Sequence, residues 1–230
     1  MKYVCWMVCA LFVAFGCSAW ATMIDLNSNS TAADPRQTNN LTGANVLITP
    51  HPAWNPNGAG LWISYADTGN GGALSPPNVP DPITGTDANP PTAILYLTFT
   101  LPYDYNSGSI TVWADDTASV WLDVPSADAD AAPVHETLLI DANPVQGSAC
   151  ADAPVSCSPG GGAKLSLNGL TQGVHTIEID AYQRGGGPFG VQYEGSIDSE
   201  EAPEPATCVP FAAGLALLYW WRWRRALAVA

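Results

Sequence analysis

Ser109-Ile-Thr-Val-Trp-Ala-Asp-Asp-Thr-Ala-Ser-Val-Trp-Leu-Asp123 is the stretch that decides the fold of this 230-residue chain. Aliphatic residues occupy alternate positions on both sides of the central Asp115-Asp116 pair. Such alternation is typical of strands with one buried face. The stretch therefore predicts two strands joined by an acidic turn, as in a β-hairpin. The same alternation places Trp113 and Trp121 on the face that points away from the core.

Similar short apolar runs continue along the chain and are separated by clusters of Gly, Pro, Asn and Asp. They occupy residues 45–49, 60–66, 93–101, 109–114, 119–124, 136–140, 164–168, 173–182 and 189–197. Outside the two ends of the chain, no segment keeps a helical period for three turns. The 21 glycines and 20 prolines also favour many turns over helices. We therefore predict an all-β fold, a jelly-roll-type sandwich of two sheets.

Two stretches of the chain resemble a known class of sandwich domain. Residues 109–123 are similar to the acidic hairpin of galactose-binding-like and PA14-like domains. Residues 170–195 contain a strand around His175, a glycine-rich turn and a closing strand, which are similar to the last strands of those domains. The resemblance implies a binding or structural module, but such a fold does not determine which ligand is bound.

The acidic residues of the first stretch are a candidate calcium site. Calcium takes six to eight oxygen ligands, which carboxylates, carbonyl groups and water can supply. PA14-like lectins use an Asp-Asp pair for calcium, so the resemblance implies this role for Asp115 and Asp116, with Asp123 as a further candidate. The alternative is a solvated acidic turn, in which water and salt screen the repulsion between the carboxylates. No other cofactor is predicted.

Trp113 and Trp121 are candidate carbohydrate-binding residues. An indole ring offers a flat apolar face on which a sugar ring can stack. The alternative is that both rings pack beneath a neighbouring sheet or loop, because tryptophan is on average a highly buried residue.

Two cysteines are expected to form a disulfide. Cys150 and Cys157 lie in one loop-like segment, whereas the other four cysteines lie in the two terminal segments. In an oxidising compartment, such a pair is expected to bond and to pin its loop. The closed loop is short, so the bond should contribute only about 2–3 kcal/mol.

The N-terminal segment has the features of a secretory signal peptide. Lys2 precedes an uncharged apolar stretch, and Ala19-Trp20-Ala21 provides the small-x-small pattern of a cleavage site. We expect a signal helix within residues 1–21, cleavage before Thr22 and export of the chain.

The C-terminal segment resembles the PEP-CTERM sorting signal of exported bacterial envelope proteins. It contains a Pro-Glu-Pro triplet, an apolar stretch and an arginine cluster. The apolar stretch, residues 206–221, would form a helix of roughly 24 Å, which is short for a hydrocarbon core of roughly 30 Å. The resemblance implies temporary membrane anchoring and an exosortase-type processing enzyme as partner. A permanent tail anchor and a buried helix are the alternatives. The residues assigned to the signal are Pro203, Glu204, Pro205, Arg222, Arg224 and Arg225.

These features divide the chain into a signal peptide (1–21), a sandwich domain (22–201) and a sorting tail (202–230). Without the two terminal segments, three basic residues face twenty acidic ones, a net charge of about −17. Nucleic acid is therefore excluded as a partner, because binding phosphates requires clustered Lys and Arg.

The sequence predicts an exported, non-catalytic envelope or extracellular-matrix protein of a Gram-negative-type bacterium. It would sit in the inner membrane before processing and at the cell surface or in the matrix afterwards. Extracellular polysaccharide is the candidate ligand. The alternative function is that of a secreted glycosidase-like enzyme, which would require two facing carboxylates.

Overall fold

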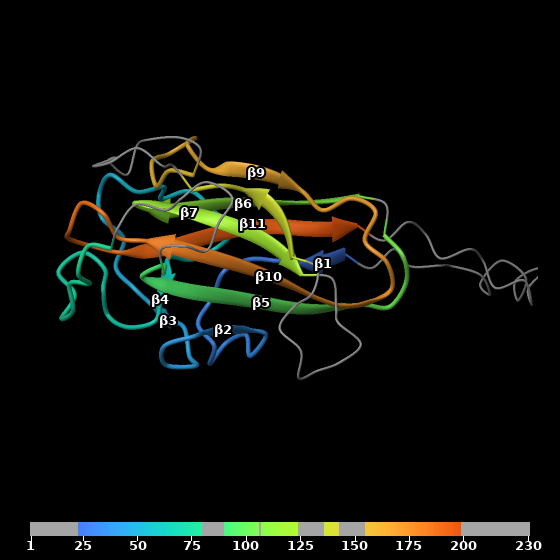
Figure 1. Ribbon diagram of the computed structural model, residues 1–230, viewed down its shortest axis with the longest axis horizontal. Coiled ribbons are helices and arrows are strands. Elements are labelled where there is room, and N and C mark those ends of the chain that lie inside the picture. Colours follow the sequence, from blue (N-terminus) through green and yellow to red (C-terminus); the bar gives the residue numbers. More distant parts are fainter. Residues whose placement is uncertain (1–22, 80–89, 106, 124–135, 143–154, 199–230) are drawn as a thin grey trace, which may run out of the picture. The chain divides into compact units, whose positions relative to one another are not determined.

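The computed structural model describes residues 23–79, 90–105, 107–123, 136–142 and 155–198, which belong to one compact unit, Met23–Asp198 (Figure 1). These residues form two antiparallel sheets, and no helix occurs among them. The all-β prediction is confirmed. The predicted signal helix, the sorting tail and its residues from Pro203 to Arg225 lie outside the described part of the chain.

The first sheet has the strand order β3-β4-β11-β6-β9, with β1 also paired to β11. Its strands are β1 (Met23–Asp25), β3 (Val46–Leu47), β4 (Ile63–Ser64), β6 (Ser107–Asp115), β9 (Ala163–Ser166) and β11 (Gly190–Asp198). The second sheet has the order β2-β5-β10-β7-β8. Its strands are β2 (Gln37–Asn39), β5 (Ala93–Leu101), β7 (Thr117–Asp123), β8 (Glu136–Ile140) and β10 (Gly173–Tyr182).

The core lies between the sheets and follows from the alternation of the long strands. Along β5, buried residues occupy every second position from Ala93 to Leu101. The neighbouring strand β10 buries Ile177, Ile179 and Ala181 in the same way. Because side chains alternate between the two faces of a sheet, this pattern directs one face of each sheet toward the other. The apolar side chains of both inner faces form one continuous cluster.

The predicted hairpin at Asp115-Asp116 is wrong. β6 pairs with β11 and β9, whereas β7 pairs with β10 and β8, so the chain crosses from the first sheet to the second. Only Asp116 separates β6 from β7, and the commonest tight hairpins need two loop residues. The alternating pattern shows only that each strand buries one face. Two strands that face each other across the core, in different sheets, fit this pattern as well as two strands paired in a hairpin.

The positions of the strand ends place the acidic pair far from the ends of the described unit. Met23 of β1 is the register partner of Asp198 of β11, so both ends of the unit lie side by side in the first sheet. Gly190, at the other end of β11, is the partner of Asp115. Eight residue steps along a strand correspond to about 26 Å. The acidic pair and the two ends therefore lie at opposite ends of the first sheet.

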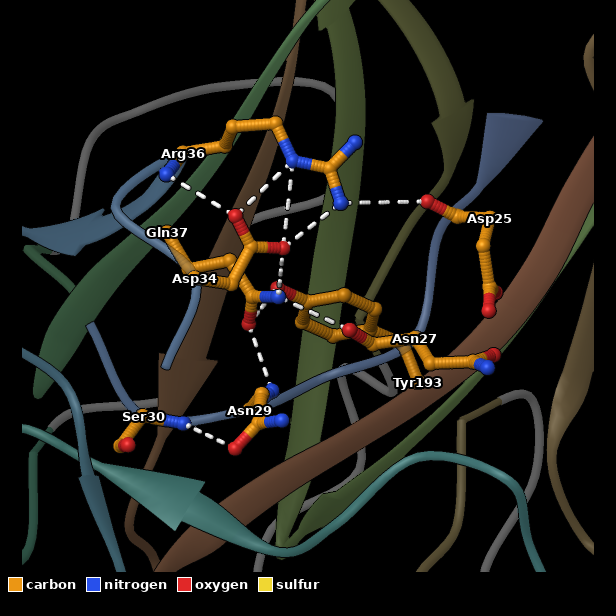
Figure 2. Close-up of polar contacts among 8 residues, drawn as sticks. All are labelled: Asp25, Asn27, Asn29, Ser30, Asp34, Arg36, Gln37 and Tyr193. Carbon is orange, nitrogen blue, oxygen red and sulfur yellow. Dashed lines mark hydrogen bonds and ion pairs between the residues drawn. The ribbon is translucent and has the colours of Figure 1, made fainter. Parts of the chain in front are cut away.

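A polar network fixes the segment between β1 and β2 to β11 (Figure 2). The side chain of Gln37 is fully buried and uses all its hydrogen-bonding groups. Its Nε2 donates to the carbonyl oxygen of Asn27 at 2.8 Å and to Oδ2 of Asp34 at 2.9 Å. Its Oε1 accepts from the amide of Asn29 and from the hydroxyl of Tyr193, each at 2.7 Å. This arrangement satisfies a polar group that would otherwise be costly to bury.

Candidate functional site

Asp115 and Asp116 are buried where the chain crosses between the sheets. They are 7% and 6% exposed, respectively. A turn of a surface hairpin would leave both side chains in water, but the crossing places them between the ends of two sheets. The solvated acidic turn considered as an alternative is therefore not what the structure contains.

The carboxylate of Asp116 is held by the segment that connects β10 to β11. Its Oδ2 accepts hydrogen bonds from the amides of Arg184 and Gly185, both at 2.6 Å. The backbone amide of Asp116 donates to the carbonyl oxygen of Tyr182 at 3.1 Å. These hydrogen bonds fix the Asp116 carboxyl group to the backbone of the β10–β11 connection.

Asp115 has a different environment, in which the neutral form is favoured. Its Oδ2 accepts a hydrogen bond from Nε1 of Trp54 at 2.8 Å. Burial, followed by the hydrogen bond and the charge of Asp116, raises the pKa of Asp115 to about 8, although the Trp54 bond acts in the opposite direction. The neutral form of Asp115 is therefore favoured, and its carboxyl group is hydrogen-bonded to that of Asp116.

A second apolar cluster, on the outer side of the first sheet, supports Trp54. This outer tryptophan cluster consists of Ile48, Trp54, Trp62, Trp113 and Cys157. The rings of Trp54 and Trp62 have centroids 4.2 Å apart. Gly190, beside Asp115 in the sheet, lets the cluster approach, because a Cβ at this position would collide with Ile48. The cluster therefore holds the Trp54 indole over the end of β6.

Two exposed segments lie near the acidic pair. A Cβ at Gly185 would lie 3.5 Å from both carboxylate oxygens of Asp116. The side-chain oxygen of Asn78 lies 3.6 Å from the corresponding point at Gly186. Asn78, Gly185 and Gly186 are all exposed. Solvent therefore reaches these two segments, whereas the two carboxyl groups beside them are buried.

Asp123, the third candidate calcium ligand, does not join this pair. It lies at the far end of β7, where it pairs with Thr176 of β10. Six residue steps separate it from Thr117, which corresponds to about 20 Å along a strand. The prediction that Asp123 belongs to the same site is wrong because the strand runs away from the crossing.

The structure also separates the two candidate carbohydrate-binding tryptophans. Trp113 lies in the first sheet and is 6% exposed within the outer tryptophan cluster. Trp121 lies in the second sheet, is partly exposed, and donates from Nε1 to Oδ2 of Asp180 at 2.9 Å. Because both rings point away from a core that lies between the sheets, they cannot form one stacking surface. The structure therefore does not bring the two candidate tryptophans together, because β6 and β7 lie in different sheets. Carbohydrate binding by either ring stays a prediction.

Cys157 is disulfide-bonded, as predicted, and buried in the outer tryptophan cluster. Its predicted partner, Cys150, lies outside the described residues. The pairing itself therefore stays a prediction.

The described residues supply few side-chain ligands for a metal at the acidic pair. In the described part of the chain, no group of three or more His, Cys, Asp or Glu side chains is arranged to hold a metal. A calcium ion at Asp115 and Asp116 would thus need most of its oxygen ligands from backbone carbonyls, water or a bound ligand. These donors are all oxygens, which fits calcium better than a softer metal.

Family models, curated proteins and solved structures give no match to this chain. The resemblances seen in the sequence therefore stay predictions. Within the described ranges, no helix is long and apolar enough to cross a membrane.

Sequence reasoning did not identify Trp54, Arg184 and Gly185 as parts of the site. Trp54 precedes Asp115 by 61 positions, and Arg184 and Gly185 follow Asp116 by 68 and 69. Arg184 and Gly185 act through backbone amides, and nearly every residue type has such an amide, so their identity in the sequence does not indicate this role. Trp54 is visible in the sequence as an aromatic residue in an irregular segment, but nothing there indicates its partner.

Proposed function

We propose that this chain is an exported, non-catalytic envelope or extracellular-matrix protein whose sandwich binds carbohydrate through a calcium ion held by Asp115 and Asp116. The observation that carries the proposal is the burial of two adjacent carboxyl groups at the crossing between the sheets. We further infer a jelly-roll-type sandwich. The chain changes sheet on each passage from β4 to β7 and again from β8 to β11, which supports this topology.

The electrostatics of the pair favour a bound cation. Two adjacent carboxylates repel each other strongly when both are removed from water, so one must be neutralised. Burial and the neighbouring Asp116 raise the pKa of Asp115 to about 8, which favours a proton at this position. A divalent cation can replace that proton and neutralise both charges at once.

The small number of protein carboxylates supports a role in ligand binding. Calcium held by only two side chains keeps several coordination positions for other oxygens. Hydroxyl groups of a sugar can occupy such positions. The exposed segments around Asn78 and Gly185 lie where a saccharide could reach the ion. A calcium-dependent carbohydrate site would use these parts of the structure together.

The glycosidase-like alternative finds no support in this pair. Retaining and inverting glycosidases hold their two carboxyl groups about 5 Å or more apart. Asp115 and Asp116 are in hydrogen-bond contact. Export, temporary anchoring and processing rest on the sequences of residues 1–21 and 202–230.

The proposal is tested by treating the exported protein with chelator, removing the chelator, and then titrating the protein with calcium in a calorimeter. We expect saturable binding that Asp115→Asn with Asp116→Asn abolishes. The matched control is Asp25→Asn with Asp198→Asn, which removes the same number of carboxyl groups at the opposite end of the first sheet. On a glycan array, calcium should restore any binding that chelator removes. Protein that binds no calcium, or binds glycans equally in chelator, would contradict the proposal.

A further inference from the structure

We propose that the outer face of the second sheet binds an uncharged polysaccharide whose sugar rings stack on Tyr96 and Trp121. These two aromatic residues lie on β5 and β7, on either side of the central strand β10 (Figure 1). Both are register partners of Glu178, so the three residues form one row across the sheet. This site does not include Asp115 or Asp116, and it does not depend on the calcium ion of the proposed function.

The row points away from the core because side chains alternate along each of the three strands. The residues next to it in the strands are buried between the sheets: Leu95, Leu97, Val120, Leu122, Ile177 and Ile179. Neighbouring residues of a strand point to opposite faces, so Tyr96, Glu178 and Trp121 lie on the outer face. All three are partly exposed. Part of each aromatic side chain is thus open to solvent, as a stacking ligand requires.

A hydrogen bond holds the Trp121 indole in one position on this face. Its Nε1 donates to Oδ2 of Asp180 at 2.9 Å. Asp180 is the register partner of Ser119, two residues along the strand from Trp121, so the indole leans across toward β10 to make this bond. A side chain that is already held in one position loses little further conformational freedom when a ligand binds, and this favours affinity.

The spacing of the two rings requires a chain of sugars rather than a single sugar. Two strand-to-strand steps separate Tyr96 from Trp121, which places their Cα atoms about 10 Å apart. One pyranose ring does not reach across this distance, whereas successive units of a polysaccharide do. Their apolar faces can stack on the flat faces of the aromatic rings. Thr98 and Thr176 add hydroxyl groups in the next row of the same face, where their Oγ1 atoms are 3.1 Å apart.

The charge of the face selects among polysaccharides. Glu178 and Asp180 are acidic, whereas the five strands of this sheet, β2, β5, β7, β8 and β10, contain no Lys or Arg. A polymer that carries carboxylate or sulfate groups would be repelled, because like charges placed together oppose binding. The hydroxyl groups of a neutral sugar can instead donate charge-assisted hydrogen bonds to the Glu178 carboxylate between the rings. We therefore expect a neutral ligand.

Affinity electrophoresis in native gels tests this inference. The gels contain hydroxyethylcellulose, dextran or galactomannan as neutral polymers, or alginate as an anionic polymer, and chelator removes any contribution of calcium. We expect at least one neutral polymer to retard the unmodified protein, and alginate to leave its mobility unchanged. No retardation by any of the three neutral polymers, or the strongest retardation by alginate, would overturn the inference.

Two substitutions locate the binding surface. Trp121→Ala and Tyr96→Ala should each weaken binding by about tenfold, the loss expected when one stacked ring is removed. Tyr103→Ala is the matched control, because Tyr103 is an exposed aromatic residue that follows β5 and lies outside the row. Circular dichroism shows whether each variant folds. Equal retardation of the control and the folded row variants would overturn the inference, and if Trp121→Ala does not fold, Tyr96→Ala decides in the same way.

A further variant separates this surface from the calcium site. Asp115→Asn with Asp116→Asn should be retarded in chelator as strongly as the unmodified protein. Loss of retardation in this folded double variant would place the sugar at the acidic pair and overturn the inference. Failure of the unmodified protein to bind calcium in the calorimeter would instead overturn the proposed calcium site and leave the outer face of the second sheet as the carbohydrate-binding surface.

Discussion

The hydroxyl of Tyr193 donates a hydrogen bond to Oε1 of Gln37 at 2.7 Å, across 156 positions of the sequence. Both side chains are buried, and Tyr193 lies in the middle of β11. Burial raises the pKa of the Tyr193 phenol well above its ordinary value. The hydroxyl therefore remains protonated and continues to act as the donor. This contact joins the N-terminal segment to the last strand of the sandwich.

Gln37→Leu should destabilise the protein by about 1–3 kcal/mol, because it leaves the buried Tyr193 hydroxyl without its acceptor. Urea unfolding measures this difference. Gln172→Leu is the control, since Gln172 is exposed and should change stability by less than about 0.5 kcal/mol. Equal effects of the two substitutions would show that the network contributes little.

The Asp34–Arg36 ion pair predicts a dependence of stability on acid. The hydrogen bond from Arg36, which lies 2.7 Å from Asp34, is the largest cause that lowers the pKa of Asp34 from 3.8 to about 2. A carboxyl group whose pKa is lower in the folded protein than in the unfolded chain stabilises the fold at any pH above its unfolded-state pKa. This contribution to stability is lost as the pH falls through the folded-state pKa. Asp34→Asn should therefore be less stable than the unmodified protein at pH 6, and the difference should shrink toward pH 2. A difference that is constant over this range, measured by urea unfolding, would argue against the ion pair.

The raised pKa of Asp115 predicts the opposite dependence of stability on pH, which should be measured with a chelator present to remove calcium. A folded-state pKa of about 8, above the unfolded value of 3.8, gives a contribution that is complete below pH 3.8. This contribution is lost as pH rises through about 8. Asp115→Asn, whose amide can also donate to Asp116, should remove that part of the pH dependence. Thermal unfolding between pH 5 and 9 measures the effect, and added calcium should restore stability at the alkaline end by mass action.

The pairing of Cys157 with Cys150 is open to direct measurement. Mass spectrometry of the exported protein, alkylated before digestion, should find the two peptides linked. Replacing both residues by serine should lower stability by about 2–3 kcal/mol. Freely alkylated Cys150 would show that Cys157 bonds to a different cysteine.

The sorting tail makes a prediction in the cell. Alanine at Pro203, Glu204 and Pro205 should leave the unprocessed chain in the inner membrane, whereas alanine at the exposed Pro52 should not affect its release. Fractionation and immunoblotting distinguish the two outcomes. Normal trimming and release of the altered tail would exclude the Pro-Glu-Pro triplet as the signal.

The sequence predicted the long strands well because alternation alone determines them. The predicted runs 93–101, 136–140 and 173–182 coincide with β5, β8 and β10. The three-residue strands β1 and β2 were missed, because a segment of that length has no measurable period. The contacts of Gln37 hold β2 in place, and such contacts depend on partners far away in the sequence.

The candidate site was predicted less completely for the same physical reason. The Asp115-Asp116 pair is visible in the sequence as two adjacent acids, but their burial depends on the crossing between the sheets. Alternation does not distinguish such a crossing from a hairpin. The donors from Trp54, Arg184 and Gly185 come from two other segments, so only the folded chain brings them to the pair.

The pairing of Met23 with Asp198 makes the sandwich a candidate for circular permutation. Directly opposed residues of antiparallel strands have Cα atoms about 4.5–5.5 Å apart. A linker of a few residues could therefore join these two positions into a ring without disturbing either sheet. New ends could be opened at the exposed Asn70 and Gly71, because exposed loop tips tolerate such cuts. We expect such a permuted chain to form the same two sheets with the same strand order, although it would no longer begin at β1.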